Sequence, residues 1–502
     1  MKIIIKSPIK AFLSEYTEEE MASLLKILTY TNTGIQHLIK RHSQNHFWRS
    51  KNVDSWQFRL DELKKDLKKT LIFDDGNKSL YIRPGSIPYL SALNPQVENQ
   101  VVYPSPKKMP WKHPIPFTFH PYQDDSCRLL PIERHGNVSL TTGSGKSAII
   151  LKLCQQLGLN ICIVAPGKGV FNELVEKFQY HFGKKNVGMF GDGKKKLEKF
   201  TIAIGDSLAN IIPGSLEYEF FSSLDVLIVD ESHTFAAESL ETICHGVLAN
   251  IPYRFFLSAT QCRNDGSLPL LQSIIGRTVC ELGTAEAIKK GYICNHDFRI
   301  VSMESSNPSS LESDPLAQKR VHFLNNSNIA QFIAKLANGM YLSQGKQTLV
   351  LCEELSQLAM LAPLLKVPYA LAHSEKRAAR LAVLGLEKVD VSESIEKFNK
   401  GEAAVLAGTS CLHVGVNIYP THNTANWAGG ASEIKTKQGA VGRSVRFGHS
   451  NPWAAKCVPK EKSTIWDFDI ENNFTMSRHL EARMGCYRES GTEIKYIRLK
   501  KS

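Results

Sequence analysis

The chain contains 502 residues, 42% of them hydrophobic, so it is too long for a single core and about three folded domains are expected. Its net charge of +12 favours a polyanionic partner, although basic proteins without such a partner are common. The sequence has no long apolar run free of charges, which excludes a membrane-spanning helix. The 11 cysteines are scattered without a C-x-x-C pair, which argues against disulfides and a zinc site and fits a reducing cytosol.

The beginning of the chain predicts a β-strand. Lys6 and Lys10 interrupt the apolar residues that follow Met1, so a secretion signal is not expected. A proline-rich stretch at residues 103–116 then predicts a linker, which separates an N-terminal domain at residues 1–110 from the rest of the chain.

The N-terminal segment is basic, with 17 lysines and arginines against 11 aspartates and glutamates in residues 1–110. It places cations beside aromatic rings at Lys40-Arg41-His42, at Phe47-Trp48-Arg49 and near Trp56. Such a surface can bind phosphates and stack on bases. An equally weighted alternative is a small α+β domain whose aromatic residues form its core and whose lysines are solvated. Residues 64–69, rich in lysine, favour a solvated helix face.

A glycine-rich loop follows at Thr141–Ser147, between an apolar strand-like run and a helix-compatible run. This is the context of a P-loop, in which backbone N–H groups and a helix N-terminus surround phosphate oxygens. Lys146 would reach the β- and γ-phosphates, and Ser147 would ligate Mg²⁺. Leu140 stands where the usual pattern has its first glycine, and an ordinary strand–turn–helix connection is the alternative.

The run Leu224–Val229 is apolar on both faces, which is typical of a strand in the middle of a parallel sheet. Asp230 and Glu231 follow it directly, at the strand end where such sheets carry their catalytic groups. Asp230 can hold Mg²⁺ through water, and Glu231 can orient or deprotonate an attacking water. The alternative is an acidic pair that stabilises a helix N-terminus.

Two arginines, Arg443 and Arg446, lie three residues apart, so on a helix they share one face and can point at one anion. Arginine supplies positive charge to phosphoryl transfer. The pair lies nearly 300 residues after Lys146, which predicts a second domain and an ATP site between two domains.

Together and in this order, the three motifs resemble those of superfamily 2 helicases and translocases of the DExH kind, over residues 115–450. The resemblance implies an ATPase with a Mg²⁺ cofactor, in which Gln123 reads adenine beside His120 and Tyr122. In this chain Asn417 stands where the family usually has aspartate. This leaves in question one polar link between the two motor domains. The further positions that the resemblance assigns are Thr142, Gly143, Ser144, Gly145 and Gly415 for the nucleotide, Gln438 for catalysis, Pro166, Gly167, Ser207 and Thr409 for the nucleic-acid backbone, and His233, Ser258 and Thr260 for coupling hydrolysis to movement.

Within the superfamily, the chain is similar to phage recombination and repair helicases of the UvsW type. This implies two tandem RecA-like α/β domains with parallel sheets behind a small α+β accessory domain. The expected boundaries are 1–110 for the accessory domain, 111–300 for the first motor domain, 301–320 for a polar linker, 321–450 for the second motor domain and 451–502 for an extension that completes it. The extension contains a last strand at residues 466–469 and a basic helix.

The resemblance also implies a monomer in the cytoplasm that acts on forks and four-way DNA junctions, through backbone contacts without sequence preference. Two alternatives remain open at this point. One is a DExH RNA helicase, because no residue in the sequence indicates whether the protein recognises the 2′-OH that distinguishes RNA from DNA. The other is a nucleic-acid-binding module with a decayed motor, for which Leu140 and Asn417 are the only support.

Overall fold

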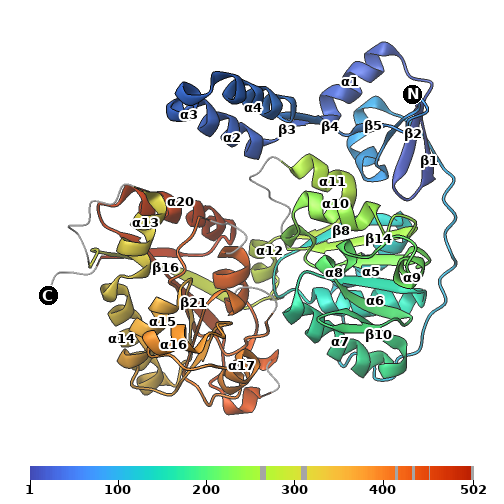
Figure 1. The fold of residues 1–502 in the computed structure, drawn as a ribbon. Coiled ribbons are helices and arrows are strands. Elements are labelled where there is room, and N and C mark those ends of the chain that lie inside the picture. The colour runs from blue at the N-terminus through green and yellow to red at the C-terminus, as the bar shows by residue number, and fades with distance from the viewer. Residues whose placement is uncertain (260–266, 307–313, 413–415, 432–435, 451–452, 499–502) are drawn as a thin grey trace. The chain divides into compact units, whose positions relative to one another are not determined.

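The computed structural model describes residues 1–259, 267–306, 314–412, 416–431, 436–450 and 453–498. The elements form two compact units, one of Met1–Leu140 and Gly145–Glu281 and the other of Thr141–Ser144 and Leu282–Ser502. Figure 1 labels many of the elements in each unit. Each helix in the described ranges is too short or too polar to cross a membrane.

The N-terminal segment begins with a small mixed sheet. Its strand order is β5 (Ile72–Asp74), β6 (Leu80–Ile82), β2 (Lys10–Ser14), β1 (Lys2–Ser7) and β7 (Gln96–Asn99). The strand predicted for the start of the chain is therefore confirmed as β1. Helix α1 (Glu18–Leu28) starts at a capping box, in which the Thr17 and Glu20 side chains each accept a hydrogen bond from the other residue's backbone.

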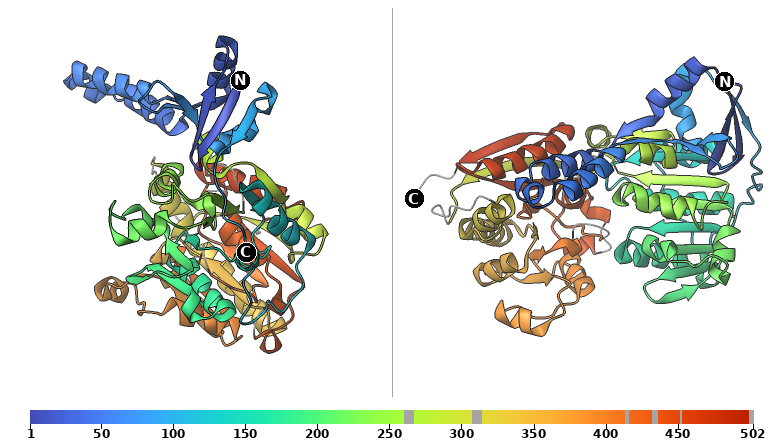
Figure 2. Two further views of the ribbon diagram at one scale, coloured as in Figure 1. Left: turned by 90° about the vertical axis from the view of Figure 1, so that its right-hand side faces the viewer. Right: turned by 45° about the horizontal axis from the view of Figure 1, so that its top comes forward.

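A helical arm is inserted into this segment, between the paired strands β3 (Thr29–Thr31) and β4 (Lys68–Thr70). It consists of α2 (Thr33–Ser43), α3 (His46–Lys51) and α4 (Val53–Lys65), and Figure 2 shows these helices together. Trp56 is buried and stacks on His42 at 5.3 Å between ring centres, whereas Trp48 is exposed. Trp56 thus belongs to the packed interior of the arm, as one interpretation expects, and nucleic-acid binding by the exposed residues stays a prediction. The predicted basic helix face is shorter than expected, because α4 ends at Lys65 and strand β4 follows.

The small sheet packs directly against the first unit's large domain. The 3₁₀ segment Pro84–Leu93 lies against helix α11 (Leu268–Ile275), and a Cβ on Gly85 would stand 2.3 Å from the Ser273 carbonyl oxygen. The buried Arg83 side chain pairs with Glu241 and donates to Ser273 Oγ at 3.0 Å. The N-terminal segment shares one hydrophobic core with this domain.

The proline-rich segment is not a free linker. Its backbone donates hydrogen bonds from Lys107 to Leu157 O, from Met109 to Gln155 O and from Lys112 to His181 O, each 2.8 Å long. These acceptors lie at the ends of α6 (Lys146–Leu157) and α7 (Lys168–Phe182), and the Trp111 ring stacks on Phe182 at 4.9 Å. The segment, which we call the strap, is held along its length on the first large domain.

The first large sheet has eight strands. Their order is β11 (Lys194–Lys196), β10 (Val187–Gly191), β12 (Phe200–Ile204), β9 (Ile161–Ala165), β13 (Val226–Val229), β14 (Tyr253–Ser258), β8 (His135–Leu140) and β15 (Thr278–Leu282). The six strands from β10 to β8 in that order pair in parallel, and β11 pairs antiparallel with β10. The accompanying helices are α5 (Pro121–Glu133), α6, α7, α8 (Gly205–Ala209), α9 (Leu216–Ser222), α10 (Ala237–His245) and α11. Helix α12 (Thr284–Lys289) follows the last strand and belongs to the second unit. All four residues of β13 are buried, as the apolar run predicts.

The second large sheet has seven strands, all paired in parallel. Their order is β18 (Tyr369–Ala372), β19 (Val405–Gly408), β17 (Thr348–Leu351), β20 (Asn423–Asn426), β21 (Lys462–Ile470), β16 (Asn295–Met303) and β22 (Ile494–Arg498). Its helices include α13 (Pro315–Lys319), α14 (Ser327–Gln344), α15 (Leu355–Leu361), α16 (Ala378–Val383), α17 (Val391–Asn399) and α20 (Phe474–Glu489). The predicted tandem α/β fold is confirmed.

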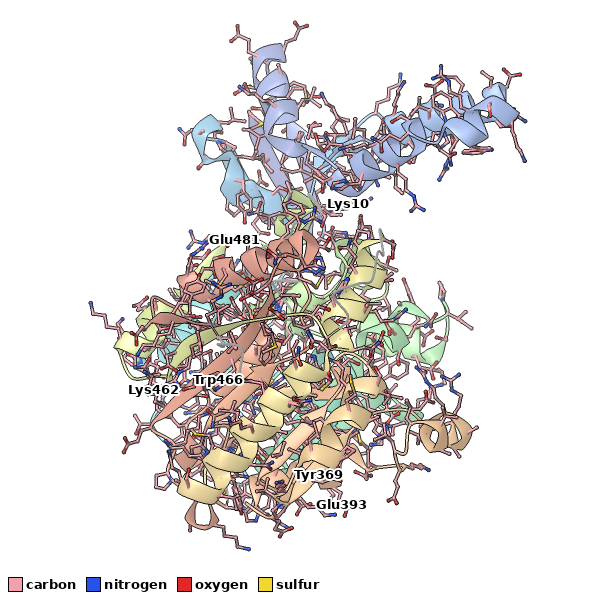
Figure 3. The ribbon with its side chains drawn as sticks, turned by 90° about the vertical axis from the view of Figure 1, so that its left-hand side faces the viewer. Lys10, Tyr369, Glu393, Lys462, Trp466 and Glu481 are labelled. Carbon is pink, nitrogen blue, oxygen red and sulfur yellow. The ribbon has the colours of Figure 1, made fainter. Side chains whose placement is uncertain are left out.

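The second sheet differs from the expected boundaries at both of its ends. Strand β16 starts at Asn295, inside the stretch 111–300 that the sequence assigns to the first motor domain. The strand expected at residues 466–469 is β21, which carries Lys462 and Trp466 (Figure 3), but β22 follows it and is the last strand described. Arg483 of the expected basic helix is buried, and it binds Asp467 through two hydrogen bonds of 2.7 and 3.0 Å.

Candidate functional site

The predicted motifs of the first unit gather at one edge of its sheet. The glycine-rich loop follows β8, Pro166 and Gly167 follow β9, Ser207 lies just after β12, and Asp230 and Glu231 follow β13. These strands run parallel in one sheet, so their carboxyl ends lie at the same edge, where open α/β sheets bind ligands.

The glycine-rich loop has the backbone that its glycines allow. Gly143 and Gly145 adopt φ values of +86° and +82°, and α6 begins immediately afterwards at Lys146. The buried Lys146 ammonium lies 3.3 Å from Glu231 Oε1 and also donates to the Leu140 carbonyl at 3.3 Å. Leu140, the departure from the usual pattern, therefore contributes through its backbone, and its side chain lies in the core.

The two carboxylates form a buried acidic site. The Glu231 backbone N–H donates to Asp230 Oδ1 at 3.0 Å, and Asp230 is only 4% exposed. Burial raises the pKa of Asp230 to about 7, and the neighbouring Glu231 charge adds to this, while Lys146 opposes it. A divalent cation would relieve this burial and repulsion, and carboxylate oxygens are the ligands that Mg²⁺ prefers. Ser147, half-buried in the first turn of α6, offers the hydroxyl that a P-loop uses for the same ion.

A polar chain leads from the acidic pair to the next strand. His233 Nδ1 lies 3.5 Å from Glu231 Oε2 and 2.9 Å from Ser258 Oγ, and both His233 and Ser258 are buried. Glu231 itself adopts φ +48°, a left-handed conformation that non-glycine residues seldom take and that often marks a functional site. The structure thus brings together two of the predicted coupling residues, and Thr260 lies outside the described residues.

Gln123 packs against the glycine-rich loop. Its Oε1 accepts the His120 backbone N–H at 2.9 Å, and a Cβ on Gly145 would stand 2.5 Å from its Nε2. The His120 and Tyr122 rings stack nearby, with 5.7 Å between centres. The three residues expected around adenine therefore lie together at the start of α5, beside the phosphate loop.

The candidate backbone contacts of the first unit are neighbours. Gly167 is the N-cap of α7, and Ser207 lies in α8. Their strands β9 and β12 pair in parallel up to Ala165 and Ile204, so both residues sit on adjacent strand ends and are half-buried. Thr409 lies in the second unit after β19, where it is buried and its N–H bonds Ala372 O at 3.0 Å.

The arginine pair does not share one helix face as expected, because helix α19 (Gly442–Ser444) ends before Arg446. Arg443 is buried and donates to the carbonyls of Leu412 at 3.2 Å and Val416 at 2.6 Å. Arg446 donates to Asn417 Oδ1 and lies 5.7 Å from the centre of the Tyr419 ring.

Both arginines therefore bond the segment that follows β19, within the second unit. At Asn417 the amide oxygen accepts the Arg446 hydrogen bond, so the substitution for aspartate keeps an acceptor and removes a charge. Gly415 and the Gln438 side chain lie outside the described residues.

Sequence reasoning missed Lys460, which is buried beside the arginine pair. It stands in the charged run Pro459-Lys460-Glu461-Lys462, which is typical of a solvated surface, and no sequence signal separates it from its neighbours.

Parts of the chain are similar to known sequences. Residues 117–263 match the family described as "Type III restriction enzyme, res subunit". The DNA 3'-5' translocase XPB2 of Sulfurisphaera tokodaii is 25% identical over 208 residues. That alignment covers 41% of this chain and 45% of the relative, so the chain spans less than half of the length of that protein.

Two solved structures show a similar fold. Dbp5 of S. cerevisiae, bound to RNA and ADP BeF3, aligns with 83% of this chain and 93% of its own at 13% identity and a TM-score of 0.51. A putative HsdR subunit of a type I restriction enzyme from Vibrio vulnificus aligns with 75% of this chain and 67% of its own at 16% identity and a TM-score of 0.50. T4 UvsW aligns over the whole of both chains at 14% identity and a TM-score of 0.40.

Proposed function

We propose that this chain, which has the fold and motifs of the superfamily 2 helicases, uses ATP hydrolysis to move along DNA or to separate its strands. The observation that carries the proposal is the buried contact of 3.3 Å between Lys146 and Glu231 at the carboxyl edge of a parallel sheet. It joins a phosphate-binding loop to a candidate general base. This arrangement also argues against a decayed motor.

Each residue has one proposed role. Lys146 binds the β- and γ-phosphates, and Gln123 faces the adenine. Ser147 and Asp230 would hold Mg²⁺, which when bound neutralises phosphate charge. Glu231 orients and deprotonates the attacking water, and its contact with His233 links this step to Ser258 on β14. Arg443 and Arg446 are proposed to supply positive charge to the transferring phosphoryl group.

We propose branched DNA as the substrate, such as forks and four-way junctions in recombination, repair or replication. The similarity to a protein named as a DNA translocase supports DNA. The candidate contacts Gly167 and Ser207 follow strand ends and suit a sugar–phosphate backbone, which carries no base sequence. An RNA helicase is the competing candidate, and a structure that contains RNA shares the fold.

The substrate class is tested by ATP turnover of the full chain. We expect stimulation by forked and four-way DNA junctions to exceed that by linear duplex DNA, and RNA of matched length to stimulate least. Stimulation by RNA alone would assign the protein to RNA, and no turnover with any nucleic acid would contradict the motor itself.

The helical arm supports a contact with phosphates outside the motor. Residues 29–70 carry nine lysines and arginines against four acidic residues, and all nine cations are exposed. Deleting residues 1–110 would remove part of the hydrophobic core that the N-terminal segment shares with α11. Substitutions in the arm test the contact with phosphates without unfolding the first unit.

We expect Lys40→Ala, Arg41→Ala and Arg59→Ala together to weaken binding to a four-way junction and to spare ATP turnover without DNA. The salt dependence of binding should become shallower by roughly 0.9 for each phosphate that the arm no longer neutralises. Binding is measured across a salt series on a junction and on a linear duplex.

The matched control replaces three exposed lysines of the second unit, Lys335, Lys366 and Lys388, with alanine. Equal junction preference and equal salt dependence in the arm variant and the parent would exclude the arm from substrate binding.

A further inference from the structure

Lys460 is a buried cation whose hydrogen bonds, within the described part of the chain, are to backbone carbonyls. It lies two residues before β21, where Lys462 is labelled in Figure 3, and it is 5% exposed. Its ammonium donates to the carbonyls of Ser444 and Arg446, both at 2.7 Å, and to that of Tyr419 at 3.4 Å. Three donors thus meet three acceptors, which matches the full capacity of a protonated lysine.

The acceptors belong to the elements that place Arg446. Ser444 ends α19, whose last carbonyls have no partner within the helix. The carbonyl between the other two, that of Val445, accepts the Cys294 N–H at 2.8 Å, so three successive carbonyls are fixed. Tyr419 carries the ring beside the Arg446 guanidinium. Lys460 therefore holds both the backbone of Arg446 and the residue against which its side chain lies.

The three carbonyls bind the Lys460 ammonium in place of a carboxylate. Among the described residues, Lys460 forms no ion pair with a carboxylate, and burial lowers its pKa to about 8. The absence of a side chain at Gly448 lets its backbone lie close to Lys460, because a Cβ there would stand 2.9 Å from Lys460 Cβ. A buried charge costs stability unless its hydrogen bonds are complete. An apolar side chain would avoid this cost but would leave the carbonyls of the arginine segment without a partner.

We propose that Lys460 is a positioning residue for Arg446, whose ammonium clamps the end of α19 and the Tyr419 backbone so that the arginine is held ready for phosphoryl transfer. The proposal rests on the proposed function for the role of Arg446, whereas the clamp itself is a property of the second unit. The proposal predicts that Lys460 affects ATP turnover only through Arg446. The affinities for ATP and for DNA should not depend on Lys460.

The test replaces Lys460 with methionine, which keeps much of the side-chain volume and removes the donors. We expect kcat for DNA-stimulated ATP hydrolysis to fall by about 10- to 100-fold, as misplacing a reacting group does, with KM for ATP unchanged. In an Arg446→Ala background, Lys460→Met should cause no further loss, because the two residues act as a unit. Lys456→Met, at an exposed lysine four residues earlier, is the matched control and should behave as the parent.

Hydrogen exchange tests the clamp without nucleotide. We expect faster amide exchange in peptides that cover residues 436–450 of the Lys460→Met variant, and parental rates in the Lys456→Met control. Faster exchange in the variant, together with a parent that has no ATPase activity, would support the clamp and contradict the proposed function. Unchanged exchange, or losses of kcat that add in the double variant, would overturn the positioning role.

The pH dependence of the parent provides a second readout if Lys460→Met does not fold. The ammonium is charged below pH about 8 and loses a proton as the pH rises through that value, which leaves two donors for three carbonyls. Burial raises the pKa of Cys294 and lowers the pKa of His422, and it lowers the pKa of His296 to about 4, so these neighbours titrate outside this window. Arg446 also faces Lys460, and its charge contributes to the lowered pKa of Lys460.

We therefore expect kcat of the parent to fall above pH 8, and Arg446→Ala to lack this decline. A decline of the same size in both proteins would contradict the proposal.

Discussion

Lys146→Ala is expected to abolish ATP hydrolysis while DNA binding in the absence of nucleotide stays at the parental level. The substitution removes the ammonium that would meet the β- and γ-phosphates. It also removes the cation 3.3 Å from Glu231, so the acidic pair loses the charge that lowers the pKa of Asp230. The pKa of Asp230, which burial raises to about 7, should rise further, and this disfavours the ionised carboxylate needed to hold Mg²⁺. Turnover is measured at saturating DNA over a range of ATP concentrations.

Lys152→Ala is the matched control for this prediction. Lys152 lies in the same helix, six residues after Lys146, where its ammonium pairs with Asp124 at the surface. Its loss should change turnover little, because surface ion pairs contribute little to stability. Parental turnover in Lys146→Ala would remove the assignment of a phosphate-binding loop to Thr141–Ser147.

Glu231→Gln should slow hydrolysis by at least roughly 100-fold and leave ATP binding intact, in line with typical general-base contributions. Glutamine keeps the length of the side chain and an acceptor for Lys146, but it cannot take a proton. Loss of the Glu231 charge also removes one cause of the raised pKa of Asp230, so Asp230 should ionise more readily and the Mg²⁺ site should persist. Nucleotide affinity and single-turnover hydrolysis are measured on the same protein.

Glu238→Gln, at an exposed position in the first turn of α10, is the control for the loss of one carboxylate. If Glu231→Gln lost ATP affinity instead of turnover, Glu231 would be a structural partner of Lys146 and not a base.

The central elements of the first unit were predictable from sequence because they obey local rules. Four buried aliphatic residues followed by two carboxylates are typical of the middle strand and the active edge of a parallel sheet. Glycines at 143 and 145 allow a backbone that other residues disfavour. Once several strands are known to be parallel, the rule that their carboxyl ends meet places Gly167, Ser207 and Asp230 together without further information.

The second unit was harder to predict, because its site depends on where a helix ends and on what a side chain meets. A spacing of three residues predicts one helix face only while the helix continues, and α19 stops at Ser444. Lys460 looked like a surface lysine because burial of a cation is decided by carbonyls from distant segments, at Tyr419 and Ser444. Likewise, no pattern in the N-terminal sequence indicates that the backbone of Gly85 packs against that of Ser273.

The strap is part of the first large domain, because it completes the ends of two of the domain's helices. Helices α6 and α7 each end with carbonyls that no residue of the same helix can reach, and residues 107–112 donate to them from outside. A fragment cut at residue 117, where the family similarity begins, would leave these helix ends to water and would uncover the Phe182 ring. We therefore expect the smallest piece of this fold that is stable alone to start before its first recognisable motif, at a boundary set by helix ends rather than by the proposed ATP-binding residues.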